Sequence, residues 1–320
     1  MLKQIVLMSV AFAGVCYGQA DSYTSRFYTQ AGFLYWKTNV NGLAYAVEAS
    51  PSSIVLGRGS VHTPAFGWGP GFNVGLGYRI PHDAWKIDLQ FTSYRTHCTT
   101  LLHSEEDRVL LPVWTSPSSG GSGTFMRMSQ HYRLHLGFVD LLLSKQLPLT
   151  PRITVSPSIG ISYFSVRQKY HLNYSDPDDP IAWSMKNKFW GLGPSMGCSG
   201  EISLFKGFSL FGNVAVKLPY GQFYTHQGER LEKRGGKQLR LFDRFSSVAP
   251  VAAGTLGFRF QTPVSNRGKQ WNIEIGYDQM LLFAQNQLPH FVQSSSPGLI
   301  VANSGDLSIR GAHLTVGFAF

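Results

Sequence analysis

The chain has 320 residues, of which only 14% are charged, 13% are aromatic and 34 are glycine. Ordinary globular chains carry about 25% charged residues, yet a mean hydropathy of −0.07 is too low for a bundle of membrane-spanning helices. The formal net charge of +10 includes no run of Lys and Arg interleaved with stacking aromatics, so nucleic acid is not expected as a partner.

The first twenty residues have the pattern of a secretory signal peptide. Lys3 precedes an apolar run over residues 5–15, and small residues in Gly18-Gln19-Ala20 stand where cleavage is determined. We expect residues 1–20 to be removed and residues 21–320 to form one exported domain with a net charge of +9. A lipoprotein anchor at Cys16 is the alternative, but it requires a small residue where Val15 stands.

Long segments of alternating apolar and polar residues follow, separated in turn by tight turns and long polar loops. Such a rhythm is typical of up-and-down barrels of the bacterial outer membrane. The predicted fold is therefore all-β: a single transmembrane antiparallel barrel of about ten strands, within a range of eight to twelve, with short periplasmic turns and long extracellular loops. The expected strands are 27–48, 66–80, 85–95, 128–145, 152–170, 187–205, 208–220, 247–261, 270–283 and 307–320.

Alternation assigns a lipid face and a polar lumen face to each strand, with two exceptions. Tyr132 and its in-phase neighbours are expected to face lipid, which would place Asp140 there as well unless a bulge shifts the register. Leu307 and Ile309 are out of phase with the last strand residues, which predicts a second shift near Gly311.

The chain ends on an alternating strand that closes with Phe320. A terminal strand with a final Phe resembles the signal that outer-membrane assembly machinery reads, so we assign Phe320 that role and the protein to the bacterial outer membrane. A soluble β-sandwich is the alternative, although strands this long are unusual in sandwiches.

Several motifs resemble the pore-forming major outer-membrane protein family of Legionella and chlamydia-like bacteria. They are GFLYWKTNVNGLAYAVE (32–48), GFNVGLGYRIPHDAWKIDLQFTSYRT (71–96), VDLLLSK (139–145), PSIGISYFSVRQKY (157–170), NKFWGLGPSMG (187–197), GFSLFGNVAVKLPYGQF (207–223) and IEIGYDQMLLFAQNQL (273–288). The resemblance implies an abundant envelope barrel with diffusion-channel activity and no catalytic residues. Its chlamydial members suggest an intermolecular disulfide through Cys98. Ser144-Lys145 replaces the Gly-Arg that the family often has.

Charged residues on the lumen face are the ones that a channel needs, because fixed charges act strongly on ions in a low-dielectric wall. An equally weighted interpretation is that they form salt bridges that fill a narrow barrel. The candidate pore-lining residues are Arg79, Lys86, Asp88, Arg133, His135, Lys217, Arg259, Glu274 and Asp278.

Other constellations carry weaker signals. The basic stretch 221–246 is expected to be an outer loop that binds lipopolysaccharide phosphates, folds inward or is simply solvated. Residues 176–180 lack the spacing of a calcium loop, no histidine pair has metal-ligand spacing, and no hydrolase motif accompanies Asp278. We therefore expect no metal, no cofactor and no enzymatic activity.

The sequence thus favours a porin-like channel for passive diffusion of small polar solutes, with a structural role in the envelope. The alternative is a plugged structural or adhesive barrel that acts through its extracellular loops. The expected partners are outer-membrane lipid, lipopolysaccharide and small polar solutes, and assembly into homo-oligomers is left open.

Overall fold

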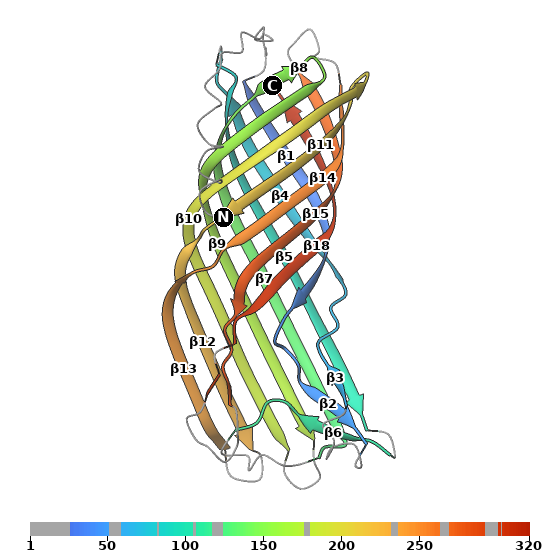
Figure 1. Ribbon diagram of the computed structural model, residues 1–320, viewed down its shortest axis with the longest axis vertical. Helices are drawn as coiled ribbons and strands as arrows, with labels where there is room; N and C mark the ends of the chain where they lie inside the picture. Colours follow the sequence, from blue (N-terminus) through green and yellow to red (C-terminus); the bar gives the residue numbers. More distant parts are fainter. Residues whose placement is uncertain are drawn as a thin grey trace, which may run out of the picture.

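The computed structural model describes residues 26–50, 59–81, 83–104, 107–116, 124–175, 180–231, 236–262, 269–291, 300–301 and 303–320. The expected signal peptide and most of the 176–180 segment lie outside this range. Ten antiparallel strands close into a barrel (Figure 1). In ring order these are β1 (Phe27–Val40), β4 (Trp68–Arg79), β5 (Trp85–His103), β7 (Arg127–Lys145), β9 (Ile153–Ser175), β10 (Ile181–Phe205), β11 (Phe208–Lys217), β14 (Val251–Gln261), β15 (Gln270–Asn286) and β18 (Gly305–Ala319).

The first and last strands form the seam of the barrel. Strand β1 pairs with β18 from Tyr28↔Ala319 to Val40↔Leu307 without interruption. The backbone amide of Phe320 donates to the carbonyl of Phe27 at 2.9 Å, so the last residue closes the ladder. The prediction of a closed antiparallel barrel of ten strands is confirmed.

Two neighbouring strands are interrupted at the same height. Strand β11 continues after Leu218-Pro219 as β12 (Tyr220–Leu231), and β13 (Gly236–Val248) continues after Ala249-Pro250 as β14. Proline lacks an amide proton and interrupts a ladder, which accounts for both breaks. Strand β12 pairs with β10 and β13, whereas β13 pairs only with β12 among the described strands. The β12–β13 hairpin flares from the barrel (Figure 1).

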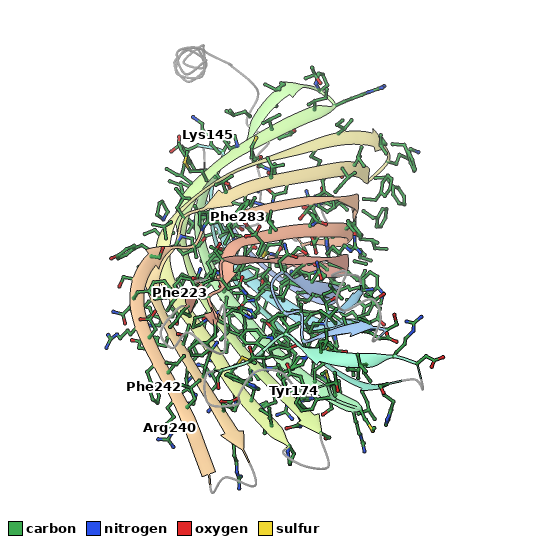
Figure 2. The ribbon with its side chains drawn as sticks, turned by 60° about the horizontal axis from the view of Figure 1, so that its bottom comes forward. Lys145, Tyr174, Phe223, Arg240, Phe242 and Phe283 are labelled. Atoms are coloured by element: carbon green, nitrogen blue, oxygen red, sulfur yellow. The ribbon has the colours of Figure 1, made fainter. Side chains whose placement is uncertain are left out.

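The sequence prediction of a loop over 221–246 is therefore wrong. Its residues alternate in charge and polarity and form a hairpin that lengthens the wall, and β5, β9 and β10 also run beyond their predicted ends. Figure 2 shows Arg240 and Phe242 on this hairpin, at the margin of the wall.

Smaller elements complete the two ends. A three-stranded sheet at the outer end joins β2 (Ala46–Ala49), β3 (Ser60–His62) and β6 (Val109–Pro112), and β16 (His290–Phe291) pairs with β17 (Ile300–Val301). At the periplasmic end β8 (Leu147–Thr150) pairs with the start of β9. Gly207 turns between β10 and β11 with φ +78°, which an L side chain rarely adopts.

A continuous apolar belt surrounds the wall on its periplasmic side. Its exposed members alternate with buried residues along every strand, as expected of a surface in contact with lipid. Representatives from successive strands are Phe33, Leu76, Leu89, Leu141, Ile161, Leu192, Val216, Leu256, Ile275 and Leu314. Among the described residues no helix is long and apolar enough to span a membrane.

Neither predicted register shift occurs. Strand β7 pairs continuously with β5 and β9 through Asp140, and β18 pairs continuously with β1 through Gly311. Tyr132, Asp140 and Leu307 all point inward and are buried. Both anomalies have one cause. In the outer half of the barrel the apolar residues of a strand face the interior, whereas in the belt they face lipid, so the apolar–polar alternation along the strand changes phase between the two regions.

Candidate functional site: the filled interior

Charged side chains in the periplasmic half of the interior form a network of ion pairs. The guanidinium of Arg259 on β14 binds Glu274 on β15, with Nε to Oε1 at 2.7 Å, and also binds Glu201 on β10. Glu201 accepts a hydrogen bond from Ser209 at 2.7 Å. These groups satisfy one another across four neighbouring strands of the wall, β10, β11, β14 and β15, which keeps the cost of burying each charge low.

A second group of interior polar residues lies beside β1. The Tyr28 hydroxyl donates to the carboxylate of Asp88, and the guanidinium of Arg79 lies over the Tyr28 ring, 5.1 Å from its centroid. Lys86 lies on the same face of β5 as Asp88. The lumen at this level thus holds both signs of charge, as the sequence predicted.

Two buried acid–base pairs occupy the middle of the barrel. Lys217 Nζ lies 2.6 Å from Asp140 Oδ2, and the ammonium also lies over the rings of Phe138 and Phe164. Ser162 donates to the other oxygen of Asp140. This carboxylate, which the sequence placed against lipid, is therefore fully engaged inside the barrel.

The second pair joins Asp278 on β15 to His313 on β18, with Oδ2 and Nδ1 2.9 Å apart. The indole of Trp36 donates to the same oxygen at 3.0 Å, and Thr255 donates to Oδ1 at 2.8 Å. Sequence reasoning found no histidine partner for Asp278, because His313 becomes its neighbour only through the β15–β18 ladder. With both oxygens engaged, this carboxylate links four strands, β14, β15, β18 and β1.

The outer half of the interior is filled by three connecting segments. Leu43 and Tyr45 come from the segment after β1, Trp114 from the segment between β6 and β7, and Leu288 from the segment after β15. Each is at most 3% exposed and packs in one cluster with inward-facing wall residues. We call this group of segments the plug. Side chains crowd the space that the strands enclose (Figure 2).

Polar wall side chains fix the plug by donating to its backbone carbonyls. Tyr170 donates to Leu43 O and Tyr174 to Tyr45 O, each at 3.0 Å. Gln168 donates at 3.0 Å to the carbonyl of Gln285, which lies at the end of β15 directly before the plug segment. Asn187 donates to the same carbonyl, and Gln227 donates to Pro289 O at 2.8 Å. The wall thus carries hydrogen-bond donors from three neighbouring strands for buried carbonyls that loops would otherwise leave unsatisfied.

Trp114 is the centre of the plug. Its indole donates to Ala44 O at 2.8 Å, and its ring packs against His290 and, more distantly, Tyr170 and Trp183. Burial lowers the pKa of His290, because its charged form would lie among these rings without water. At neutral pH the histidine is therefore a neutral packing element.

Seven of the nine predicted pore-lining residues face the interior: Arg79, Lys86, Asp88, Lys217, Arg259, Glu274 and Asp278. Their part in conduction stays a prediction. Arg133 and His135 do not face it, because the phase of β7 is opposite to the predicted one, and both lie exposed on the outer wall. No local sequence pattern predicted the residues of the plug. The in-phase run from Tyr132 to Asp140 was an indirect sign of an apolar interior, because these residues face inward.

The intermolecular disulfide through Cys98 stays a prediction, and the structure places this thiol inside the barrel. Its side chain is only 6% exposed and points inward, where its sulfur contacts the amide of Gln130 at 3.5 Å. Cys198 lies on the outward, lipid-facing side of β10, and both thiols are free. Among the described residues no group of three or more His, Cys, Asp or Glu side chains is placed to hold a metal ion.

A family model described as the Legionella pneumophila major outer membrane protein precursor matches residues 21–320. A comparison with curated proteins gave no match. Among solved structures, the outer membrane protease OmpT of Escherichia coli is 12% identical with a TM-score of 0.46, over 94% of this chain and 99% of that one. A major outer membrane protein of Thermus thermophilus is 13% identical with a TM-score of 0.34, over 93% and 100%. A FadL homologue of Pseudomonas aeruginosa is 8% identical with a TM-score of 0.29, over 93% and 90%. Each likeness is one of overall fold.

Proposed function

The chain belongs to the family of the Legionella pneumophila major outer membrane protein and resides in the bacterial outer membrane, and from this premise we propose that it is a structural surface barrel whose interior is closed by its own loops. The observation that carries the proposal is the set of wall donors that bind plug carbonyls. A loop that covered an open mouth by chance would not meet a matching donor at so many points.

The closed form presents its loops to the outside and transmits no large solute. Among the described residues, its outer end includes the small β2–β3–β6 sheet and the β12–β13 hairpin, both of which are able to meet other molecules. We expect no catalytic turnover, because both oxygens of Asp278 are engaged by His313, Trp36 and Thr255 and serve to join strands of the wall.

The second candidate is diffusion of small polar solutes, and the charged periplasmic interior favours it. Arg79, Lys86, Asp88, Arg259 and Glu274 would line a solute path if the plug moved aside. Such a channel requires displacement of Trp114 and the segments that pack on it. It would therefore be gated by the plug, whereas a constitutive porin is open.

Conductance in planar bilayers distinguishes the two. We expect the wild-type protein at pH 7.5 to show no steady conductance, and Trp114→Ala to show frequent openings, since removal of a buried Trp costs about 3–5 kcal/mol. Trp190→Ala is the matched control, because Trp190 faces the lipid belt and is 45% exposed. Steady conductance of the wild-type protein, with solute-dependent swelling of liposomes, would refute the closed barrel and favour the channel.

A further inference from the structure

A basic surface lies on the outside of the wall, just beyond the apolar belt. Two rows of side chains run across six neighbouring strands, and the strand registers place the members of each row directly beside one another. The first row is Arg95, His135, Arg167, Lys188, Tyr224 and Arg244. The second row is His97, Arg133, Lys169, Lys186, His226 and Phe242. We call these two rows the outer-wall ladder.

Neither row of the ladder contains an acidic residue, although Asp243 lines one of the hollows described below, next to Arg244. It holds seven Arg and Lys residues, and none of the seven forms a salt bridge within the described part of the chain. Like charges directly opposite one another on adjacent strands are destabilising. Because Arg167 lies beside Lys188, and Lys169 beside Lys186, an anion bound at this surface would relieve their repulsion.

The outer-wall ladder lies at the membrane depth expected for a lipid head group. A row of apolar residues precedes it on the same six strands and includes Phe91, Tyr163 and Tyr220. Four residues separate Phe91 from Arg95, which is about 13 Å along a strand. Because barrel strands are tilted, the vertical separation is smaller, which places the cations at the level of phosphates immediately outside the acyl chains.

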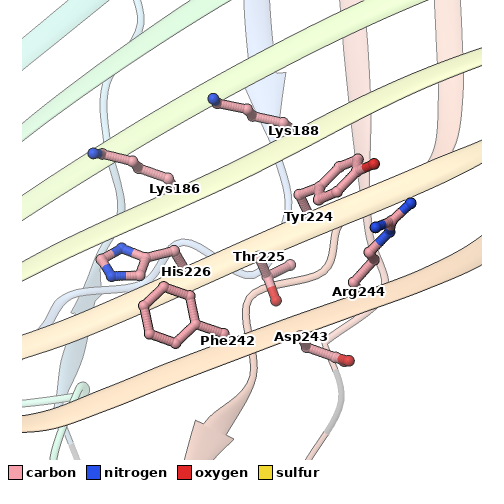
Figure 3. A pocket seen from close by; sticks show the side chains of 8 residues that line it. All are labelled: Lys186, Lys188, Tyr224, Thr225, His226, Phe242, Asp243 and Arg244. Atoms are coloured by element: carbon pink, nitrogen blue, oxygen red, sulfur yellow. The ribbon is translucent and has the colours of Figure 1, made fainter.

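Two adjoining hollows give the surface a shape. One, of about 290 Å³, is lined by Lys186, Lys188, Tyr224, His226, Phe242 and Arg244, among others (Figure 3). The other, of about 430 Å³, has Arg167 and Lys188 at one end and the aromatic Tyr163 and Trp190 at the other. Lys188 and Tyr224 belong to both. A ligand that fills them carries anionic groups next to an apolar body.

The geometry points to a binding site for the phosphorylated sugar head group of an outer-leaflet glycolipid, with Arg167, Lys188 and Arg244 on its phosphates and its acyl chains along Trp190 and the belt. Lipopolysaccharide is the lipid with this chemistry in the membrane where the barrel resides. The opposite side of the barrel provides a comparison, since Lys37 and Arg310 face each other there without further cations in their row.

The test measures binding to the complete mature protein, refolded free of lipid in detergent micelles. The probes are bisphosphorylated lipid A, dephosphorylated lipid A and inorganic phosphate, titrated by calorimetry. We expect the Arg167→Gln/Lys188→Gln double variant to bind bisphosphorylated lipid A at least roughly tenfold more weakly than wild type, because both cations that are removed would contact its phosphates. The Lys37→Gln/Arg310→Gln variant removes the same charge and should stay within twofold.

Three results would overturn the assignment. Equal losses in the two double variants would mean that net charge alone attracts the lipid. Equal affinity for dephosphorylated lipid A would remove the role of the phosphates. Full competition by inorganic phosphate at the same concentration would mean that the site takes free phosphate and no lipid. Melting temperatures of the variants within about two degrees of wild type show that the fold is retained.

Discussion

The rings of Trp114 and His290 pack against each other with centroids 3.6 Å apart, although the two residues come from different connecting segments. Neither segment belongs to the barrel wall, and their contact locks one to the other in the centre of the plug. Since one partner is titratable, we expect the packing of the plug to depend on pH.

The pKa of buried His290 lies below its ordinary value of 6.5, so the displaced plug takes up a proton before the packed plug does. Above pH 6.5 the histidine is neutral in both states and contributes no pH dependence. As pH falls below 6.5, the packed plug loses stability relative to the displaced one. We expect hydrogen exchange around Trp114, corrected for the intrinsic rate, to accelerate between pH 8 and 5. His290→Phe keeps an aromatic ring and should remove the acceleration; an unchanged acceleration in this variant would exclude His290 as its source.

The buried pair of Asp140 and Lys217 predicts a large loss of stability. Asp140→Asn leaves the ammonium of Lys217 buried without a counter-charge, which costs about 3–5 kcal/mol. The Asp140→Asn/Lys217→Met double variant should recover most of this loss. Heat-dependent migration and thermal unfolding in detergent report the change, and a single variant as stable as wild type would contradict the pairing.

The surface pair of Glu48 and Arg108 predicts a small effect. The hydrogen bond with His62, helped by Arg108, lowers the pKa of Glu48, so its contribution is present above the ordinary value of 4.5 and disappears as pH falls through the lowered pKa. Glu48→Gln should cost less than about 1 kcal/mol at pH 7, because exposed pairs are worth little. A loss as large as that of Asp140→Asn would show that the small outer sheet supports the whole barrel.

The two cysteines are expected to react differently with thiol reagents. Cys98 is buried inside the barrel, whereas Cys198 is partly accessible on the lipid face. A small apolar maleimide in detergent should label wild-type protein and Cys98→Ser equally, and Cys198→Ser should lose the label until the protein is unfolded. Labelling of folded Cys198→Ser, or a disulfide-linked dimer that Cys98→Ser abolishes, would contradict the inward position of Cys98.

Phe320 is expected to affect assembly more than stability. Its ring is 53% exposed, and its main-chain amide, which makes the bond to Phe27, is retained in Phe320→Ala. The variant should reach the outer membrane in reduced amount, while the fraction that folds should melt within a few degrees of wild type. Phe318→Ala changes the neighbouring aromatic and keeps the terminal residue. Wild-type amounts of the Phe320 variant in the membrane would remove the assembly role.

The strands were predictable because lipid imposes a strict pattern, with apolar residues such as Leu89 and Ile275 outward and polar ones such as Asp88 and Glu274 inward. The pattern fails where the interior stops being polar. Around Tyr132 the inward residues are apolar because they pack on the plug, and the outward ones, such as Arg133, lie above the belt. Period-two alternation gives the two faces of a strand but not which face is inside.

The plug itself could not be predicted, because its contacts join segments far apart in the chain. Nothing near Trp114 or Leu43 indicates that Tyr170 and Trp183 will surround them. The pairing of Asp278 with His313 likewise depends on the register of β15 against β18. Such sites require knowledge of which strands are neighbours and at which height.

The prolines at 219 and 250 also indicate the outer limit of the hydrocarbon layer. Beyond them β13 has one edge without a strand partner among the described residues, and a backbone edge of this kind is not tolerated in contact with hydrocarbon. The ring of paired strands must therefore stay closed to the full depth of the acyl chains, and its opening at these prolines sets the outer boundary of the hydrocarbon layer. Strand pairing at these two prolines therefore indicates how deeply the barrel is inserted in the membrane. This indication does not depend on the side chains that contact lipid.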